Sequence, residues 1–415
     1  MRLYVFPLLK DLRIIEAASF VAGPSCGLHL VQLGAEVIRL DQIGGGPDFH
    51  RWPLAPGGGS LYWDGLNKGK KSVSIDLTRP EGRDLAVALA TARGNNAGLF
   101  ITNFPLKSFL SYERLSSERN DFICLRIMGW SDGTQAVDYT INCAVGLPYL
   151  TGHPDDERPV NHVLPAWDLL AGAYGAFALL AAERERRISG SGRHVQLALS
   201  DLAAATLGNL GQVAEVLIRG RDRLRCGNDI FGAFGRDFLT RDGERVMVVA
   251  ITPRQWKALV AACRLDTAIA SLETELCVSF ENDEGVRFVH RDRLVPLFSA
   301  AIQARDLNQL SACFEAHGVC WSRYQSLQEA VSGDSRLFSG DSIFSSVAYA
   351  DGMAYPTPGA AVRLQGEERA AARRAPLLGE NTDEVLASVL QLSSAEIGRL
   401  HDQAIVAGPG RRHGS

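Results

Sequence analysis

The chain has 415 residues, of which 46% are hydrophobic and 22% are charged, and its formal net charge is −4. These proportions are typical of a folded globular protein with about two or three domains. The small negative charge argues against a broad nucleic-acid-binding surface, although it permits a local basic patch for a phosphate group. The longest uncharged run, residues 169–182, is too short to cross a bilayer.

Targeting, redox and metal signals are weak throughout. Residues 1–11 lack the apolar run and the small-residue cleavage site of a signal peptide, so we expect a cytoplasmic protein with no membrane partner. The eight cysteines form no C-x-x-C pair, and the nine histidines show no metal-binding spacing. We therefore expect neither disulfides nor a metal site.

Strands and helices alternate along the first half of the chain. Apolar runs and turn residues predict strands and intervening helices, in chain order, at 13–16 (strand), 27–33 (helix), 36–41 (strand), 72–77 (strand), 80–92 (helix), 98–104 (strand) and 122–127 (strand). This alternation predicts a mostly parallel sheet covered on both faces, in which ligands bind beyond the carboxyl ends of the strands.

The second half changes character after a charged linker at 219–225. Before this linker the pattern predicts helices at 169–182 and 199–218. After it, the pattern predicts a strand at 244–251 and helices at 253–263, 285–304 and 307–317. The C-terminal part contains β-like segments within 345–364 and helices at 382–390 and 394–402. We expect a large α/β domain over 1–218, a small α+β domain over 226–320, and a C-terminal segment, 321–415, that returns to the large domain.

A single carboxylate, Asp168, precedes the uncharged run 169–182. The positive end of a helix favours negative charge, so we expect this aspartate to stay ionised and able to act as a nucleophile. The local sequence by itself favours a simpler interpretation, in which Asp168 caps the helix.

Three glycine-containing segments depart from the known nucleotide-binding loops. The clusters at 44–46 and 57–59 do not match G-x-G-x-x-G, which argues against NAD. Residues 65–72 depart from a P-loop in length and in having Lys71 at the hydroxyl position, so Lys68, Lys70 and Lys71 form either a phosphate-binding loop or a solvated basic loop.

The segment 23–27 matches G-x-S-x-G, and Ser25, Asp168 and His194 follow one another in the chain order of an α/β-hydrolase triad. A hydrolase is therefore one hypothesis. Against it, the motif follows the first strand and leaves no room upstream for an oxyanion loop. The alternative is a tight turn that directs backbone N–H groups toward a ligand.

Five segments in order resemble the family III CoA-transferases: Phe20–Pro24, Leu33–Asp41, Asn67–Leu77, Asn103–Phe104 and Asp168. The resemblance implies a large Rossmann-like domain, a small α+β domain and an interlocked homodimer. It also implies an acyl-CoA substrate and no cofactor beyond that CoA. Its CoA-binding positions fall on Val21, Ala22, Arg39, Gln42 (in place of an arginine), Lys70, Lys71, Ile75, Asn103 and Phe104.

The same resemblance implies that Asp168 is the catalytic nucleophile. Its carboxylate would attack the thioester, and a mixed anhydride and an aspartyl-CoA thioester would follow. Each step builds an oxyanion, so backbone N–H donors are needed, and the glycines between 227 and 235 are the candidates.

Three longer segments, 44–53, 161–168 and 227–238, resemble a subgroup of the family that moves CoA between the two carboxyl groups of one C5 dicarboxylate in the 3-hydroxypropionate bicycle. Gln135 stands near the position of the racemases' histidine, which argues against a racemase. Arg51 or Arg236 would bind the free carboxylate. The residues expected around the substrate are Arg51, Gln135, Asn228 and Arg236, with Phe231 and Phe234 in an enclosing loop.

Four functional hypotheses remain from the sequence. The first is intramolecular CoA transfer within a dicarboxylate, and the second is intermolecular transfer to another dicarboxylate. The third is thioester hydrolysis through Ser25, and the fourth is CoA or nucleotide binding without catalysis.

Overall fold

The computed structural model describes residues 6–106, 108–338, 342–349, 352–368 and 371–409. The chain forms two compact units. The first contains Met1–Val145, His162–Glu215 and Ser335–Ser415, and the second contains Gly146–Asn161 and Val216–Asp334.

These bounds differ from the expected ones mainly at two segments, besides residues 216–218, which also group with the second unit. Residues 146–161 group with the second unit, where the Arg225 guanidinium donates hydrogen bonds to the backbone carbonyls of Tyr149 and Asp156. Residues 321–334 also stay in the second unit, because the strand Cys320–Arg323 pairs with a strand of its sheet.

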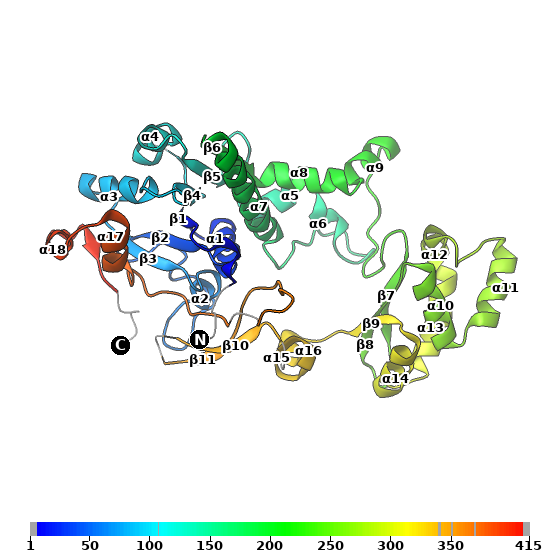
Figure 1. Cartoon of the computed structure of the whole chain (residues 1–415). Coiled ribbons are helices and arrows are strands. Elements are labelled where there is room, and N and C mark those ends of the chain that lie inside the picture. Colours follow the sequence, from blue (N-terminus) through cyan, green and yellow to red (C-terminus); the bar gives the residue numbers. More distant parts are fainter. Residues whose placement is uncertain (1–5, 107, 339–341, 350–351, 369–370, 410–415) are drawn as a thin grey trace. The chain divides into compact units, whose positions relative to one another are not determined.

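A seven-stranded sheet forms the centre of the first unit (Figure 1). Its order is β12-β3-β2-β1-β4-β5-β6, and every strand except β12 runs parallel to its neighbours. The strands are β1 (Arg13–Ala17), β2 (Glu36–Gln42), β3 (Lys71–Ile75), β4 (Leu99–Thr102), β5 (Ile123–Met128), β6 (Arg193–Ala198) and β12 (Val406–Ala407). The predicted parallel sheet is confirmed. Its strand order reverses between β1 and β4, which is where such sheets bind ligands.

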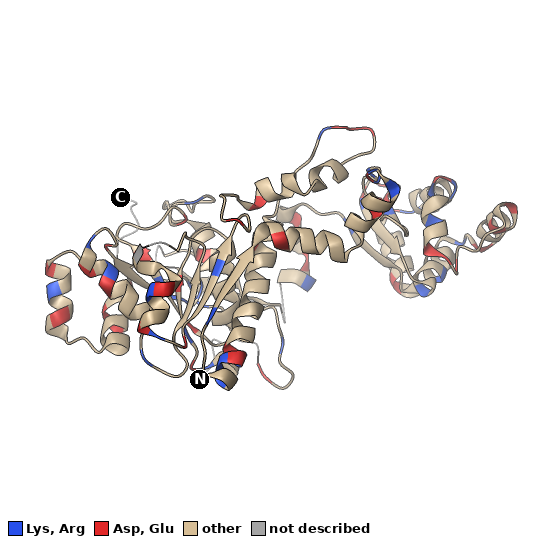
Figure 2. Cartoon of the chain, turned by 90° about the horizontal axis from the view of Figure 1, so that it is seen from above, with Lys and Arg blue, Asp and Glu red and all other residues tan. Residues whose placement is uncertain are grey.

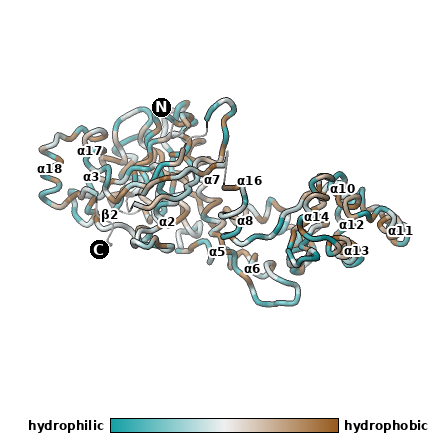
Figure 3. Tube along the Cα trace, turned by 90° about the horizontal axis from the view of Figure 1, so that it is seen from below, coloured by the Kyte–Doolittle hydropathy of each residue, from teal (hydrophilic) through white to brown (hydrophobic). Residues whose placement is uncertain are grey.

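Helices cover both faces of this sheet. On one face, α1 (Ala22–Gln32) and α7 (Ala166–Ser189) pack against each other and against the strands. On the other face, an apolar layer joins the strands to α3 (Pro80–Ala90), α17 (Thr382–Leu390) and α18 (Ser394–Asp402). Hydrophilic and hydrophobic residues alternate along α18, as a helix with one buried side requires (Figure 3).

Smaller elements complete the first unit. They are η1 (Pro7–Leu9), α2 (Leu61–Leu66), η2 (Ser108–Leu110), α4 (Tyr112–Glu118), α5 (Asp138–Ala144), α8 (Leu199–Asn209), α16 (Ser335–Phe338) and the antiparallel hairpin β10 (Phe344–Ala348) and β11 (Ala354–Pro358). The helix predicted at 199–218 is in fact two helices, α8 and α9 (Gln212–Arg219). Gly211 separates them with a φ of 75°, a left-handed conformation that an α-helix cannot contain.

Two glycines of α7 let it approach its neighbours closely, Gly172 at α1 and Gly175 at β5. A Cβ at Gly172 would lie 1.9 Å from the Ser25 Oγ, and one at Gly175 would lie 3.1 Å from the Leu125 side chain. A side chain at Gly172 would force the two helices to shift, whereas one at Gly175 would displace Leu125 only slightly. The contact fixes the position of the first turn of α7, which carries Asp168.

The second unit is a small α+β structure around an aromatic core of Phe234, Trp256, Phe280 and Phe298. Its antiparallel sheet contains β7 (Phe234–Leu239), β8 (Arg245–Ala250) and β9 (Cys320–Arg323). Its helices are α6 (Leu147–Leu150), α10 (Pro253–Cys263), α11 (Asp266–Leu276), α12 (Glu284–Val289), α13 (Arg291–Gln303), α14 (Leu307–His317) and α15 (Leu327–Gly333).

One prediction for this unit needs correction, because the single helix expected at 285–304 is the pair α12 and α13. The chain turns at His290, whose φ of −100° and ψ of 20° lie outside the helical range. Acidic and basic residues are interspersed in both units (Figure 2). None of the helices in the described part of the chain is both long and apolar enough to cross a membrane.

Candidate active site

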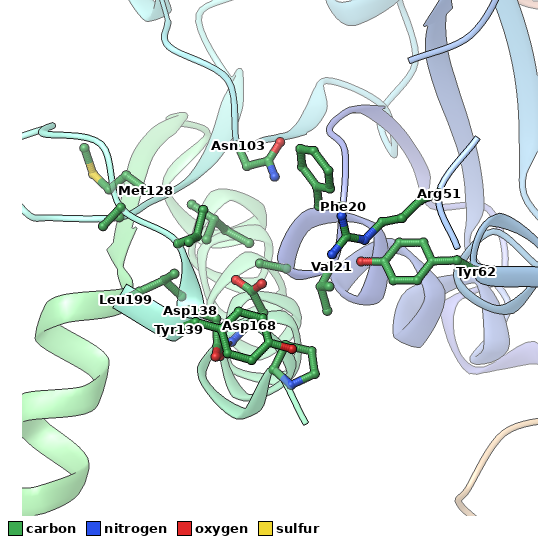
Figure 4. A pocket seen from close by; sticks show the side chains of 16 residues that line it. Phe20, Val21, Arg51, Tyr62, Asn103, Met128, Asp138, Tyr139, Asp168 and Leu199 are labelled. Atoms are coloured by element: carbon green, nitrogen blue, oxygen red, sulfur yellow. Dashed lines mark hydrogen bonds between the residues drawn. The ribbon is translucent and has the colours of Figure 1, made fainter. Parts of the chain in front are cut away.

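A cavity of about 450 Å³ lies at the carboxyl ends of β1, β4 and β5 in the first unit (Figure 4). Its position beside the reversal of strand order is the expected ligand site of a parallel sheet. Its lining includes Phe20, Val21, Ala22, Arg51, Tyr62, Asn103, Asp138, Tyr139 and Asp168.

Asp168 lies in the first turn of α7, but it does not cap that helix. The N-cap position is occupied by Pro165, which provides no side-chain cap. The Asp138 carboxylate on α5 accepts the backbone N–H groups of Trp167 (2.6 Å) and Asp168 (3.1 Å) instead. The capping interpretation of Asp168 is therefore wrong, because another residue satisfies the helix end.

The electrostatic surroundings of Asp168 also differ from expectation. Burial, and then the nearby Asp138 charge, raise the pKa of Asp168 from 3.8 to about 7. The favourable helix end does not offset these two effects, so the prediction of a permanently ionised carboxylate is corrected. Asp168 changes charge near neutral pH, as groups at working sites often do.

A tight turn between β1 and α1 forms one wall of the cavity. Phe20 has a φ of 64°, an uncommon and strained value for a residue with a side chain. Asn103, at the end of β4, holds the turn by accepting the Ser19 N–H (3.1 Å) and donating to the Ser19 carbonyl (2.7 Å). Val21 and Ala22, both predicted CoA contacts, follow this turn and line the cavity with Asn103.

An ionic network below this turn contains two of the predicted CoA-binding residues. Lys70 Nζ lies 2.9 Å from Glu16 and donates to the Pro24 carbonyl at 2.7 Å. Arg39 pairs with Glu16 (2.9 Å) and with Asp41 (3.0 Å) and donates to the Ala18 carbonyl. Because both cations are buried and engaged, Arg39 and Lys70 support the turn from inside and do not face a phosphate.

The other residues of the predicted phosphate region are also occupied. Lys71 is partly exposed and pairs with Glu36 (2.7 Å) and Glu384 (2.6 Å), and Lys68 is buried, so the three lysines do not form a freely solvated basic loop. Ile75 is fully buried in the core under α3, which excludes it as a CoA contact. Gln42 is exposed at the end of β2 and donates to the Gly45 carbonyl.

Opposite Asp168, the cavity contains a guanidinium and a phenol. Arg51 lies over the rings of Phe20 (5.4 Å) and Tyr62 (5.3 Å), and among the described residues it pairs with no carboxylate. The Tyr62 hydroxyl is buried without a hydrogen-bond partner in the described structure. Burial raises the pKa of Tyr62 to about 12, so its hydroxyl remains a proton donor. Figure 4 shows both side chains on the opposite side of the cavity from Asp168.

Comparisons with known proteins identify the family. Residues 9–382 match the model of CoA-transferase family III. The chain belongs to that family. It is 46% identical over 405 residues, 97% of this chain and 99% of the other, to 2-methylfumaryl-CoA isomerase of Chloroflexus aurantiacus. It is 26% identical to human succinyl-CoA:glutarate CoA-transferase, over 96% of this chain and 90% of that protein.

A solved structure of the same architecture is that of a CAIB/BAIF family protein from Brucella suis. Its TM-score is 0.72 at 23% identity, over 93% of this chain and 100% of that one. The predicted fold class and the prediction of a family III CoA-transferase are both confirmed.

In this family III fold the hydrolase elements are not assembled. Ser25 lies inside α1, is buried, and donates to the Ala22 carbonyl at 3.1 Å. His194 is on β6 and stacks on Tyr112 at 4.6 Å. Neither residue lines the cavity that contains Asp168. The hydrolase hypothesis is therefore wrong, because Gly23–Gly27 is the start of a helix and not a strand-to-helix elbow.

Four further predicted residues lie outside the lining of the cavity. Gln135 is exposed in the loop before α5, and Phe104 is exposed directly after Asn103. Asn228 and Arg236 belong to the second unit, where Asn228 donates to Asp237 (3.1 Å) and Arg236 pairs with Asp229 (3.4 Å). The candidate oxyanion glycines, between 227 and 235, are in that unit as well.

Among the lining residues that were not predicted as site residues, three have polar side chains: Tyr62, Asp138 and Tyr139. Asp138 and Tyr139 lie about thirty positions before Asp168, and only the packing of α5 on α7 brings them together. The sequence signal that could have located them is their position as a polar pair after the loop that follows β5, because ligands bind beyond the carboxyl ends of parallel strands. Tyr62 had no local signal, since it resembles any core aromatic residue. No group of three potential metal ligands occurs among the described residues.

Proposed function

We propose that the chain is an intramolecular CoA-transferase that converts mesaconyl-C1-CoA (2-methylfumaryl-CoA) into mesaconyl-C4-CoA (3-methylfumaryl-CoA). The observation that carries this proposal is the Asp168 carboxylate in the cavity, in a chain 46% identical to 2-methylfumaryl-CoA isomerase. A carboxyl group with a pKa near 7 is about half ionised at neutral pH, and its ionised form is the nucleophile.

The reaction proceeds in four balanced steps. Asp168 attacks the C1 thioester, the C–S bond breaks, and CoA leaves as a thiolate while a mixed anhydride forms. The thiolate attacks the aspartyl carbonyl, which gives an aspartyl-CoA thioester and a free C1 carboxylate. The C4 carboxylate then attacks that thioester and expels the thiolate again. Finally the thiolate attacks the C4 carbonyl and regenerates the Asp168 carboxylate.

The substrate is oriented by two parts of the cavity. We assign the free carboxylate to Arg51, whose guanidinium has no carboxylate partner in the described structure, and to the buried Tyr62 hydroxyl. The CoA arm would pass the turn at Val21 and Ala22 and the end of β4 at Asn103 and Phe104. Of these four residues, all but Phe104 line the cavity.

Intermolecular transfer is the second candidate function. It is favoured by the similarity to the human succinyl-CoA:glutarate CoA-transferase, which also covers nearly the whole chain. In that case the dicarboxylate freed from CoA leaves the site, and a second acid takes its place.

One experiment distinguishes the two. The protein is mixed with mesaconyl-C1-CoA and isotopically labelled free mesaconate, and the thioesters are measured by mass spectrometry. Formation of unlabelled C4 thioester, lost in Asp168→Ala, supports intramolecular transfer. Label in the C4 thioester means intermolecular transfer. No conversion, or full activity of Asp168→Ala, overturns the proposal.

The assembly we propose is a homodimer. Leu170, Tyr174 and Phe177 on α7 are exposed apolar residues at helical spacing, so they form one side of the helix, which a second subunit would cover. We further propose a cytoplasmic enzyme that needs no cofactor beyond the CoA of its substrate. Activity after chelation and dialysis, and fractionation of source cells, test those two points.

A further inference from the structure

A second carboxylate lies beside Asp168 and is held firmly in place. Asp138 is 1% exposed. One of its oxygens accepts the N–H groups of Trp167 and Asp168, and its other oxygen lies 2.5 Å from the His162 Nε2. Both oxygens of this carboxylate are thus held by hydrogen-bond partners, next to the carboxyl group that has to react.

Resting on the proposed function, we infer that Asp138 and His162 are positioning residues that set the charge state and the reactivity of Asp168. Asp138 fixes the start of α7 by accepting its first free N–H groups. The same carboxylate repels the ionised Asp168 and disfavours its charged form. The Asp138 side chain thus determines both the position of Asp168 and how readily Asp168 ionises.

The repulsion has a direction that suits the chemistry. When Asp168 attacks the thioester, a C–O bond forms, the C–S bond breaks, and the electron pair leaves on sulfur. The aspartyl oxygen becomes part of a neutral anhydride, so the repulsion with Asp138 is relieved. An interaction that is unfavourable in the ground state and absent after attack lowers the barrier to acyl transfer.

His162 adjusts the strength of this effect. As a neutral imidazole it gives Asp138 a hydrogen bond, whereas as an imidazolium it also offsets the Asp138 charge. Protonated His162 therefore makes it easier for Asp168 to ionise. The titratable and charged groups facing this cluster are Tyr139 on α5, Tyr62 on α2 and Arg51 across the cavity, besides the cluster's own residues Asp138, His162 and Asp168.

The test uses two near-isosteric variants. Asp138→Asn keeps an acceptor for the helix N–H groups and a hydrogen bond to His162 but removes the charge. His162→Gln keeps a donor to Asp138 but cannot become cationic. Asp132→Asn, an exposed aspartate in the loop before α5, is the matched control. The direct readout is an infrared titration of isotope-labelled aspartate, with Asp168→Asn used to assign the Asp168 band.

The two variants are expected to move the Asp168 titration in opposite directions. In Asp138→Asn the midpoint falls by about one pH unit or more, and in His162→Gln it rises, while the control leaves it unchanged. The acidic limb of the single-turnover rate with mesaconyl-C1-CoA shifts in the same two directions. A residue with a merely structural role lowers the amplitude of the rate without shifting its pH profile.

The outcomes separate this inference from the proposed function. An Asp168 titration that is identical in wild type and both variants overturns the inference, even if the enzyme converts mesaconyl-CoA. Opposite shifts without any conversion support the inference and overturn the proposed function. If Asp138→Asn does not fold, the upward shift in His162→Gln decides alone, and a downward shift or none contradicts the inference.

Discussion

At the scale of single residues, the reactivity of Asp168 depends on Asp138. A helix start has free N–H groups, and an aspartate near it normally accepts one of them. Here Asp138 accepts two, so the Asp168 side chain has no hydrogen bond to a described residue that stabilises its charge. A partly buried carboxyl group beside a like charge loses its proton less readily, and once ionised it is a strong nucleophile.

The raised pKa of Asp168 predicts a pH-dependent effect on stability. The unfolded state releases this proton near pH 3.8 and the folded state near 7, so stability declines as pH rises between these values and is constant above. Asp168→Asn removes this pH-dependent loss of stability, because asparagine does not titrate. We expect it to stabilise the protein by about 1–3 kcal/mol at pH 8 and by less at pH 5, measured by thermal unfolding. The same gain at both pH values would contradict the raised pKa.

Arg51 predicts an effect on substrate recognition. Removing one charged partner of a carboxylate costs about 1.5–3 kcal/mol, so Arg51→Gln should raise KM for mesaconyl-C1-CoA by about 10- to 100-fold. Arg51→Lys should retain part of the affinity. Crotonyl-CoA, which has no second carboxylate, is the control ligand. If Arg51→Gln raises the inhibition constant of crotonyl-CoA as much as it raises the KM of mesaconyl-C1-CoA, Arg51 does not contact the free carboxylate.

At the scale of elements, the site is built on the contact between α1 and α7. Gly172 and Gly175 bring α7 close enough for its first turn to reach the cavity. The buried pairs of Glu16 with Arg39 and Lys70 hold the turn before α1 from below. Both walls of the cavity therefore depend on residues that never touch the substrate.

Gly172→Ala should separate the two helices. Its Cβ would lie 1.9 Å from the Ser25 Oγ, and overpacking of this kind costs about 1–3 kcal/mol. Adding Ser25→Ala should recover part of the loss, because it removes the atom in closest conflict. Gly208→Ala on α8 has open space and serves as the control. Unfolding temperatures of the four variants test this, and a fully additive double variant would exclude the contact.

Lys70 and Lys71 should respond differently to the same change. Lys70→Met leaves the buried Glu16 without one of its cations and should cost about 3–5 kcal/mol. Lys71→Met removes two partly exposed pairs and should cost under about 1 kcal/mol. Thermal unfolding measures both. Unchanged stability of Lys70→Met, with weakened CoA binding, would restore the phosphate role expected from the sequence.

At the scale of the whole molecule, two compact units are joined by several chain crossings, and the first exposes an apolar side of α7. A monomer rarely leaves such a side uncovered. Phe177→Glu is therefore expected to weaken the proposed dimer, as measured by sedimentation at several protein concentrations. Leu8→Glu, at another exposed apolar residue of the first unit, should have no effect. A wild-type protein that sediments as a monomer would overturn the proposal.

Much of the fold could be predicted because its signals are local. Apolar runs between turn residues located five of the six parallel strands, and family motifs located Asp168, Val21, Ala22 and Asn103 near one cavity. Strand β6 was not predicted, since Arg193–Ala198 has charged and polar residues among its apolar ones. The helix breaks at Gly211 and His290 were also not predicted, because amphipathic periodicity continues across them.

The sequence by itself determined the parallel sheet, the alternation with helices and a candidate nucleophile, because hydrophobic periodicity and turn chemistry act between neighbours in the chain. Only the tertiary structure decided the role of each charged residue. The sequence predicted Arg39 and Lys70 as phosphate ligands, but in the fold both pair with Glu16. The local sequence predicted Asp168 as a helix cap, but in the fold Asp138 of α5 accepts the N–H groups at that helix end. The charge state of a side chain depends on its burial and on its neighbours in space, which residues distant in the chain supply.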